Sequence, residues 1–327
     1  MLNSELRQDL VSGDWIIIAP GRLKRPNAFI KKTKTVKEPK KGCPFEDPQK
    51  SGNGEPILKY PDHKDWSLQI IPNRFPVLRH RDVCGVRSSH GPYAIFPGIG
   101  HHDILITRDH DKNFSDLSRD EARLVFQAFR DRYLGIYNDK CLSYVSMFQN
   151  WGPEAGASIY HPHYQMIAMS VVPPDIQHSL AGSARYFHDH KKCVHCVMIE
   201  FEVKEKKRIV FENDEAIAFA PFVSRSPFEI RIFPKKHLSY FENTFDSDLD
   251  SAVDLLQKSL KTISKKLNAD YNFFLHTAPI QDKDRYRHYH WHIEITPKVS
   301  ISAGFELGTG VEINIVDPDE AAKMLSN

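Results

Sequence analysis

The sequence predicts an α+β fold of two similar domains, each with an antiparallel sheet backed by a helix. Residues 102–165 and 229–294 follow one plan, in which a strand, a helix and two further strands succeed one another. Each copy ends with a His-x-His run. In each copy this run follows an earlier histidine, and the number of residues between them is nearly the same in both copies. A length of 327 residues also suits about two domains of roughly 150 residues each. An internal duplication explains all three observations.

In the first copy, each element has a local signal. The alternating apolar residues 102–107 predict a strand. Ser118 and Glu121 form a capping-box pattern, and the apolar residues that follow recur at helical spacing. A second strand is predicted over 142–148, and the copy ends on His161-Pro162-His163.

The second copy repeats this order. Residues 228–233 alternate like a strand, and apolar residues recur every three or four positions over 249–267, which predicts a helix. A strand is predicted over 271–276, before the closing run His290-Trp291-His292. The repeat makes His292 the counterpart of His163. His292 is therefore expected to be an ancestral catalytic position that now serves substrate binding or structure.

The two domains are expected at residues 1–180 and 181–327. The first carries the His-Pro-His run, and the second carries a Cys-x-x-Cys pair and the His-Trp-His run. Residues 171–192 contain Pro-Pro and Gly-Ser pairs, which indicate a linker between the two.

Composition narrows the class of protein. The formal net charge is +2, which does not favour a nucleic-acid or membrane partner. No apolar run reaches the roughly 18 residues that a membrane span needs, and the polar residues 1–9 do not resemble a signal peptide. A cytoplasmic protein is therefore expected. The odd count of five cysteines argues against a disulfide framework.

The run from His161 to Gln165 is a candidate catalytic strand. Alternate residues of a strand share a face, so His161, His163 and Gln165 are expected to point the same way. A solvent-facing strand edge is the simpler interpretation of one His-x-His alone. The preceding residues 150–158, however, are rich in small side chains and let backbone N–H groups approach a phosphate.

Phosphoryl chemistry would use these residue types. A neutral imidazole can attack an α-phosphorus and form a phosphoramidate, which divides one transfer into two easier steps. A backbone carbonyl usually holds the other ring nitrogen and fixes the tautomer. Gln165 can donate a hydrogen bond to a phosphate oxygen as charge develops there.

Two sets of residues have metal-binding types. The second-half set is Cys193, Cys196, His237 and His290. Two thiolates and two imidazoles suit tetrahedral zinc, whereas a pair of thiols or buried cysteines is the alternative. The first-half set is Cys43, Glu46, His110 and His161. It is less diagnostic because a carboxylate replaces a thiolate, and Cys84 could supply a missing thiolate.

Several long motifs resemble the galactose-1-phosphate uridylyltransferase family, a branch of the histidine-triad superfamily. The motifs lie at residues 5–26, 71–76, 156–165, 219–222, 227–229, 234–237, 290–295 and 304–310. The resemblance covers nearly the whole chain. It implies that both domains are histidine-triad-like, that zinc is bound, and that the protein forms a homodimer.

The resemblance also implies a ping-pong reaction with a nucleotide sugar and a sugar phosphate. UDP-glucose would transfer UMP to His163 and release glucose 1-phosphate, and galactose 1-phosphate would then accept the UMP. Phe305 and Glu306 would face the hexose. Gln165, His161 and Ser158 would be catalytic together with His163. The residues expected at the nucleotide and phosphates are Arg22, Arg25, Asn73, Asn150, Gly156, Ala157, Ser158 and Gln165.

There are two alternatives. The first keeps the mechanism and changes the base, and the second keeps nucleotide and zinc binding without catalysis. Related proteins transfer AMP from ADP-glucose or from dinucleoside polyphosphates, and base choice depends on the shape of the pocket. A protein of another class would bind nucleotides and zinc without turnover. The intact His163 and Gln165 favour an enzyme over that second alternative.

Overall fold

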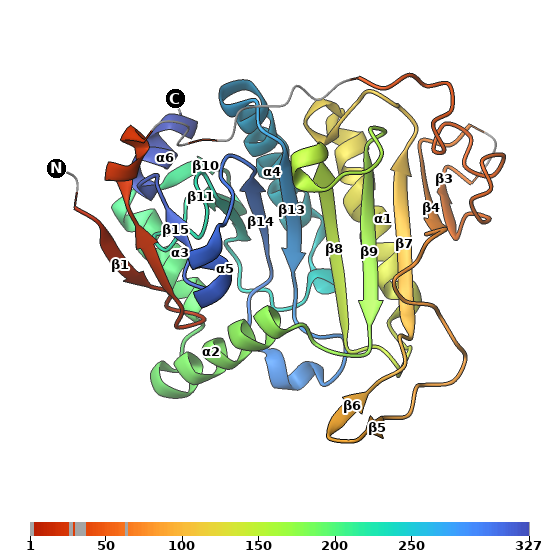
Figure 1. Cartoon of the computed structure of the whole chain (residues 1–327), viewed down its shortest axis with the longest axis horizontal. Coiled ribbons are helices and arrows are strands. Elements are labelled where there is room, and N and C mark those ends of the chain that lie inside the picture. Colours follow the sequence, from red (N-terminus) through yellow and green to blue (C-terminus); the bar gives the residue numbers. More distant parts are fainter. Residues whose placement is uncertain (1–2, 26–28, 30–36, 63–64, 327) are drawn as a thin grey trace.

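The computed structural model describes residues 3–25, 29, 37–62 and 65–326. At its centre is one antiparallel sheet of ten strands, in the order β10-β11-β12-β14-β13-β8-β9-β7-β4-β3 (Figure 1). The first-half strands are β3 (Leu58–Tyr60), β4 (Leu68–Pro72), β7 (Gly100–Thr107), β8 (Tyr144–Trp151) and β9 (His163–Met169). The second-half strands are β10 (Ile209–Glu212), β11 (Ala216–Phe219), β12 (Ile230–Pro234), β13 (Tyr271–His276) and β14 (His292–Pro297).

The predicted α+β class with two related halves is confirmed, and the two sheets are joined edge to edge. Strands β8 and β13 pair antiparallel, with Phe148 opposite Phe274. From this seam outward, the first half runs β8-β9-β7 and the second runs β13-β14-β12. Each of β8 and β13 would be an exposed edge in a separate domain, and pairing them removes both edges.

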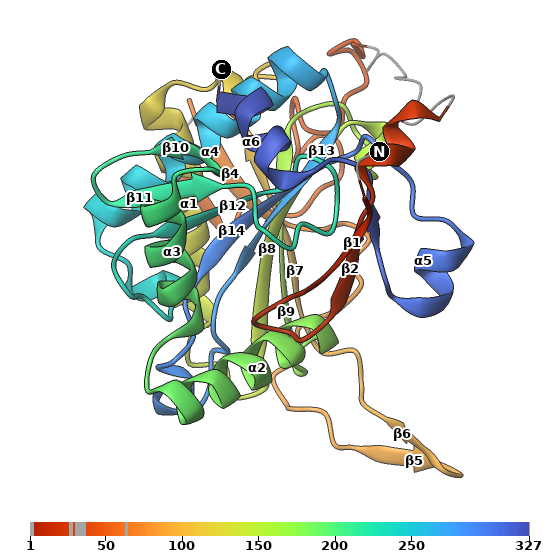
Figure 2. The same ribbon diagram turned by 90° about the vertical axis from the view of Figure 1, so that its left-hand side faces the viewer.

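Helices α1 (Arg119–Ile136) and α4 (Asp246–Leu267) cover one face of the sheet (Figures 1 and 2). The capping box at the start of α1 is confirmed. The N–H of Glu121 donates to Ser118 Oγ at 3.2 Å, and the N–H of Ser118 donates to the Glu121 carboxylate at 2.6 Å. One hydrophobic core lies between these helices and the sheet and runs through both halves.

The other face is covered mainly over the second half. A small sheet of β1 (Glu5–Gln8), β2 (Trp15–Ile18) and β15 (Ile313–Asn314) lies there, and α5 (Gly304–Thr309) projects beside it (Figure 2). The remaining helices are α3 (Val194–Glu205) and α6 (Pro318–Ser326), and a β5–β6 hairpin (Ser88–His90, Tyr93–Ile95) extends from the first half.

Two details differ from the sequence analysis. The expected linker 171–192 contains a helix, α2 (Pro174–His190), which begins with Pro174 at a position where proline is favoured. The odd cysteine count argued against a disulfide framework, and the structure contains a single bond of this kind among the described residues, between Cys84 and Cys141. Cys84 is therefore not a substitute metal ligand.

The domain boundary at residue 180 falls inside α2 and stays a prediction. Strand β1 pairs with β2, and β2 pairs with β15, which lies near the C-terminus of the chain. Residues 5–18 therefore lie with the second half in space. Among the described residues, no helix has both the length and the apolar character needed to cross a membrane.

Candidate active site and metal centres

His163 opens strand β9 on the sheet face that lies away from α1. Its side chain is 8% exposed, and its Nδ1–H donates to the backbone oxygen of His161 at 2.9 Å. Because Nδ1 carries the proton, the lone pair of the imidazole lies on Nε2. Burial lowers the pKa of His163 below its ordinary value, so the ring is neutral near pH 7. The residue therefore has the form of a nucleophile.

A tight turn precedes this strand and contains the small residues predicted to approach a phosphate. Gly152 has φ +84°, and a Cβ there would lie 2.0 Å from the Asp270 carboxyl carbon. The N–H of Ala157 donates back to the carbonyl of Gly152 at 3.1 Å, and Gly156 also has a positive φ of 84°. Ser158 follows this turn directly and precedes the His161–His163 segment by three residues.

Gln165 shares the face of His163, as the period of a strand requires. Its Oε1 lies 3.0 Å from Nε2 of His102, which is on the neighbouring strand β7. The amide nitrogen of Asn73 lies 3.0 Å from the same ring nitrogen. Of the predicted binding residues, Asn73 is thus brought close to Gln165.

Asn150 lies on β8 and is the third predicted residue on this face. Its Oδ1 accepts a hydrogen bond from the side-chain amide of Asn272 at 2.8 Å, and Asn272 also donates to the carbonyl of Ala155. This network fixes the side chain of Asn150 and attaches the turn before β9 to strand β13 across the seam.

The first predicted metal set comes together. His110 Nε2–H donates to the carbonyl of Glu38 at 2.9 Å, and His161 Nε2–H donates to that of Thr107 at 2.7 Å. The Nδ1 atoms of both rings consequently carry a lone pair, and both face Glu46 and Cys43. His110 Nδ1 lies 3.1 Å from the Glu46 carboxylate, and His161 Nδ1 lies 3.6 Å from Cys43 Sγ.

These inward atoms are acceptors that face one another. Glu46 Oε1 and His110 Nδ1 are buried and have no hydrogen-bond partner among the described residues. Two acceptors at such a distance repel unless a metal ion or a proton lies between them. The donor set of one thiolate, one carboxylate and two imidazoles therefore fits zinc. Burial lowers the pKa of His161 to about 4, which keeps that ring neutral as a ligand.

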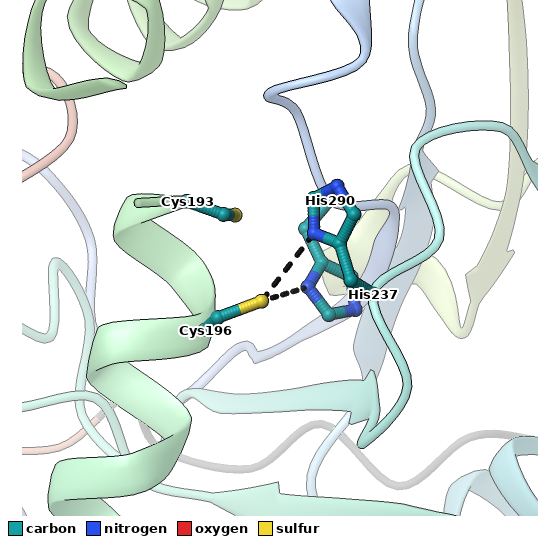
Figure 3. Close-up of side chains that lie close together, drawn as sticks. All are labelled: Cys193, Cys196, His237 and His290. Carbon is teal, nitrogen blue, oxygen red and sulfur yellow. Dashed lines mark hydrogen bonds between the residues drawn. The ribbon is translucent and has the colours of Figure 1, made fainter. Parts of the chain in front are cut away.

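The second metal set is also assembled, at the start of α3 (Figure 3). The ligand atoms of Cys193, Cys196, His237 and His290 all lie within 4.8 Å of one another. His237 Nε2–H donates to the carbonyl of Arg287 at 2.7 Å, which leaves Nδ1 3.3 Å from Cys196 Sγ. Such a carbonyl-held imidazole is the usual orientation of a histidine metal ligand. These four residues fit a closed structural zinc site.

His292, the counterpart of His163, has the same local hydrogen bond, with its Nδ1–H donating to the His290 carbonyl at 3.1 Å. Its surroundings differ. The rings of Phe233 and His276 stack on it at 4.7 and 4.8 Å. Glu294 stands where the first half has Gln165, and it pairs with buried Arg231 at 3.3 Å. The second-half position is thus filled by side chains.

The remaining predicted binding residues lie apart from β9. Arg22, Arg25 and Glu306 line a large cavity beside the second half of the sheet, together with residues of β13 and β14, and His163 is not among its lining residues. Phe305 lies next to Glu306 on α5 and is exposed. In one chain, the cavity that Arg22, Arg25 and Glu306 line thus does not include the His163 imidazole.

Sequence reasoning missed His102. The sequence contained a pattern that could have identified it. His102, Ile104 and Ile106 are alternate residues of the predicted strand and therefore share one face, which is also the face of His163 and Gln165. A histidine at the first position of an apolar alternation is a candidate for an inward-facing polar role.

Two protein-family models match the chain. A family model described as the N-terminal domain of galactose-1-phosphate uridyl transferase matches residues 2–173. A second model, described as a domain of unknown function, matches residues 93–327.

Individual relatives cover nearly the whole chain. The ADP-glucose phosphorylase of Arabidopsis thaliana is 35% identical, over 98% of this chain and 92% of its own. A galactose-1-phosphate uridylyltransferase of Thermotoga maritima is 26% identical, over 98% and 97%. The crystal structure of the Arabidopsis enzyme with bound ADP-glucose has a TM-score of 0.85 at 32% identity and covers 99% of both chains. A uridylyltransferase structure reaches a TM-score of 0.76 at 29% identity, over 98% and 97%.

Proposed function

The chain belongs to the galactose-1-phosphate uridylyltransferase family, and we propose that it transfers a nucleoside monophosphate through His163. The observation that carries the proposal is the hydrogen bond from His163 Nδ1 to the His161 carbonyl. It leaves the Nε2 lone pair free on a neutral ring, as nucleophilic catalysis requires. The donor is a nucleoside diphosphate sugar.

The transfer has two steps. In the first, His163 Nε2 attacks the α-phosphorus, a P–N bond forms, and the bond to the bridging oxygen breaks so that a sugar 1-phosphate leaves. In the second, an oxygen of an acceptor phosphate attacks the same phosphorus and the P–N bond breaks. The free enzyme is restored, and the nucleoside monophosphate is now joined to the acceptor.

The other residues have supporting roles. The amide of Gln165 would donate to a non-bridging oxygen as charge develops there, and the turn that contains Gly156, Ala157 and Ser158 would hold the phosphates. Zinc, when bound, supplies structural crosslinks. At the first site the residues that would hold it include His161, whose carbonyl orients His163.

ADP-glucose is the donor that we propose. The similarity to the Arabidopsis ADP-glucose phosphorylase, in both sequence and structure, exceeds that to the uridylyltransferases compared above. The acceptor would then be inorganic phosphate or a sugar phosphate. UMP transfer from UDP-glucose is the second candidate, because the matching family model and several relatives are uridylyltransferases.

A homodimer would complete the site. Arg22, Arg25 and Glu306 line a cavity without His163 in one chain, and α5 projects away from the sheet (Figure 2). A second copy could present these residues to the first copy's His163. Mixing inactive His163→Ala protein with an inactive Glu306→Ala protein should then restore part of the activity, whereas a site within one chain predicts none.

The covalent adduct tests the proposed function directly. The protein is incubated separately with ADP-glucose and UDP-glucose at neutral or alkaline pH, which protects the phosphoramidate, and its intact mass is measured. A gain of one AMP supports adenylyl transfer, and a gain of one UMP supports uridylyl transfer. The His163→Ala variant should gain neither.

His292→Ala provides the matched control, because it removes the equivalent imidazole from the second half. This variant should still form the adduct, provided that circular dichroism shows a native fold. An adduct on the His163→Ala protein would refute the covalent scheme. No adduct on the wild-type protein with either sugar would favour nucleotide binding without turnover.

A further inference from the structure

His102 is connected to the active-site face by both nitrogens of its ring. The side chain is 7% exposed and projects from β7 toward β9. Its Nδ1 accepts the backbone N–H of Val77 at 3.2 Å, and its Nε2 lies 3.0 Å from Gln165 Oε1. The imidazole thus bridges a backbone amide and the side-chain amide of Gln165.

The backbone amide determines which ring nitrogen carries the proton. The N–H of Val77 is always a donor and cannot be flipped, so Nδ1 of His102 must accept. In a neutral ring the proton is then on Nε2. The Asn73 amide nitrogen lies 3.0 Å from the same Nε2, but an NH2 group only donates and cannot accept the Nε2–H, so this contact is not a hydrogen bond in this tautomer. The Asn73 oxygen is engaged elsewhere, because it accepts the N–H of Phe75 at 2.8 Å. The acceptor for Nε2–H is consequently Gln165 Oε1.

This bond orients the Gln165 amide. An unrestrained glutamine amide can present either its oxygen or its nitrogen to a ligand, and only the NH2 group can donate to a phosphate. With Oε1 held by His102, the NH2 group is the free end, and the structure gives it no partner among the described residues. Gln165 and His163 lie two residues apart on one strand face, so this group is directed to the same side of the sheet as the imidazole.

We propose that His102 is a positioning residue that orients the Gln165 amide for donation to the transferring phosphate. The relay runs from the Val77 N–H through the His102 imidazole to Gln165 Oε1. In this proposal His102 acts on the transferring phosphate through Gln165 and not by direct contact. The proposal rests on the proposed function, because it names the residue that prepares the phosphate donor of that site.

A double-mutant cycle on the single-turnover rate of adduct formation tests the proposal. Loss of the Gln165 donor in Gln165→Ala should slow the rate about 100- to 1000-fold. His102→Leu, which leaves the amide free to rotate, should slow it about 10- to 100-fold. In the Gln165→Ala background, His102→Leu should change the rate less than about 3-fold, because the two residues act as one unit.

Two further variants separate orientation from folding. His102→Gln keeps a donor near the position of Nε2 and should recover much of the lost rate. His101→Leu removes the adjacent histidine, whose ring contacts Arg132 and stacks on His80 away from Gln165, and should leave the rate near that of the wild type. Independent effects of His102→Leu and Gln165→Ala, or no rescue by His102→Gln, would overturn the proposal.

The tautomer gives a readout that does not need turnover. In ¹⁵N-resolved NMR of the intact protein, the ring assigned by its loss in His102→Leu should carry its proton on Nε2, and that proton should shift in Gln165→Ala. A protonated Nδ1 would overturn the relay. If the wild-type protein forms no adduct with either sugar, the proposed function fails, and this spectrum alone decides whether His102 orients Gln165.

Discussion

At the scale of residues, the His163–His161 hydrogen bond leaves Nε2 unprotonated, and the side chains around the ring determine whether that nitrogen can reach a substrate. His292 makes the same bond to His290, yet aromatic rings cover it on two sides. The residue two positions after each histidine also differs. Gln165 can donate a hydrogen bond, whereas the Glu294 carboxylate forms an ion pair with Arg231. The chemical difference between the halves therefore depends on what surrounds two equivalent imidazoles.

Burial of His163 has a consequence for the pH dependence of the reaction. In the proposed reaction the neutral His163 ring is the nucleophile, and burial lowers the pKa of that ring, so the active form persists below the ordinary histidine value of 6.5. We expect kcat/KM for the nucleotide sugar to stay level as the pH falls to 6.5 and to decline only at more acidic pH. A profile of kcat/KM between pH 5 and 9 measures this. A decline centred at or above pH 6.5 would contradict the assignment.

Candidate site residues can be predicted from the sequence where a motif is local. The His-x-His-x-Gln run and the Cys-x-x-Cys pair are of this kind. His102 was not predicted, because its role depends on contacts with Val77 and Gln165, which lie on other segments. The disulfide was missed for the same reason, since Cys84 and Cys141 are 57 residues apart.

At the scale of elements, α2 is held against the N-terminal strands through a glycine. A Cβ on Gly182 would lie 1.5 Å from the carbonyl oxygen of Val11, which is backbone and cannot rotate away. Gly182→Ala should therefore push the helix outward and lower the free energy of unfolding by about 1–3 kcal/mol. Urea unfolding followed by circular dichroism measures the change.

Gly135→Ala is the control for that substitution. Gly135 lies in α1, and a Cβ there would meet only the far end of Arg132 at 3.9 Å. This variant should be neutral or more stable by up to about 1 kcal/mol, because alanine favours a helix over glycine. Equal effects of the two substitutions would mean that helix propensity, and not the approach of Val11, governs the Gly182 position.

The periodic elements were predictable because a helix and a strand each impose a spacing on apolar residues. Residues 271–276 were predicted as a strand and form β13. Helix α2 was not predicted, because its Pro-Pro start and internal glycine are also typical of loops. Its glycine serves close packing, which a single sequence does not reveal.

At the scale of the whole molecule, the duplication gives a symmetric arrangement that neither half has alone. The seam between β8 and β13 places Phe148 opposite Phe274, and the metal sets lie in corresponding places of the two halves. The sequence predicted two halves with a sheet each, but the joining of the sheets was not predictable. Strand pairing at a seam depends on which edges are left uncovered, and alternation alone does not determine that.

Zinc content tests this arrangement of the whole molecule. The ligand atoms of four imidazoles and three thiols form two clusters, one in each half. Protein from zinc-supplemented medium should therefore carry about two zinc ions per chain. Cys196→Ser should lose one of them, and Cys84→Ser, which breaks only the disulfide, should lose none. Elemental analysis of desalted protein gives these ratios.

Removal of the second zinc should loosen the second half more than the first. That site joins the start of α3 to the segments before α4 and β14, so its loss frees three elements at once. The thermal midpoint of Cys196→Ser should fall by at least about 5 °C, because bound metal stabilises only the folded state. Hydrogen exchange should rise first in α3, while β9 keeps its protection. Wild-type protein with no zinc, and with a midpoint unchanged by a chelator, would show instead that the inward-facing acceptors are held by some other cation or by protons.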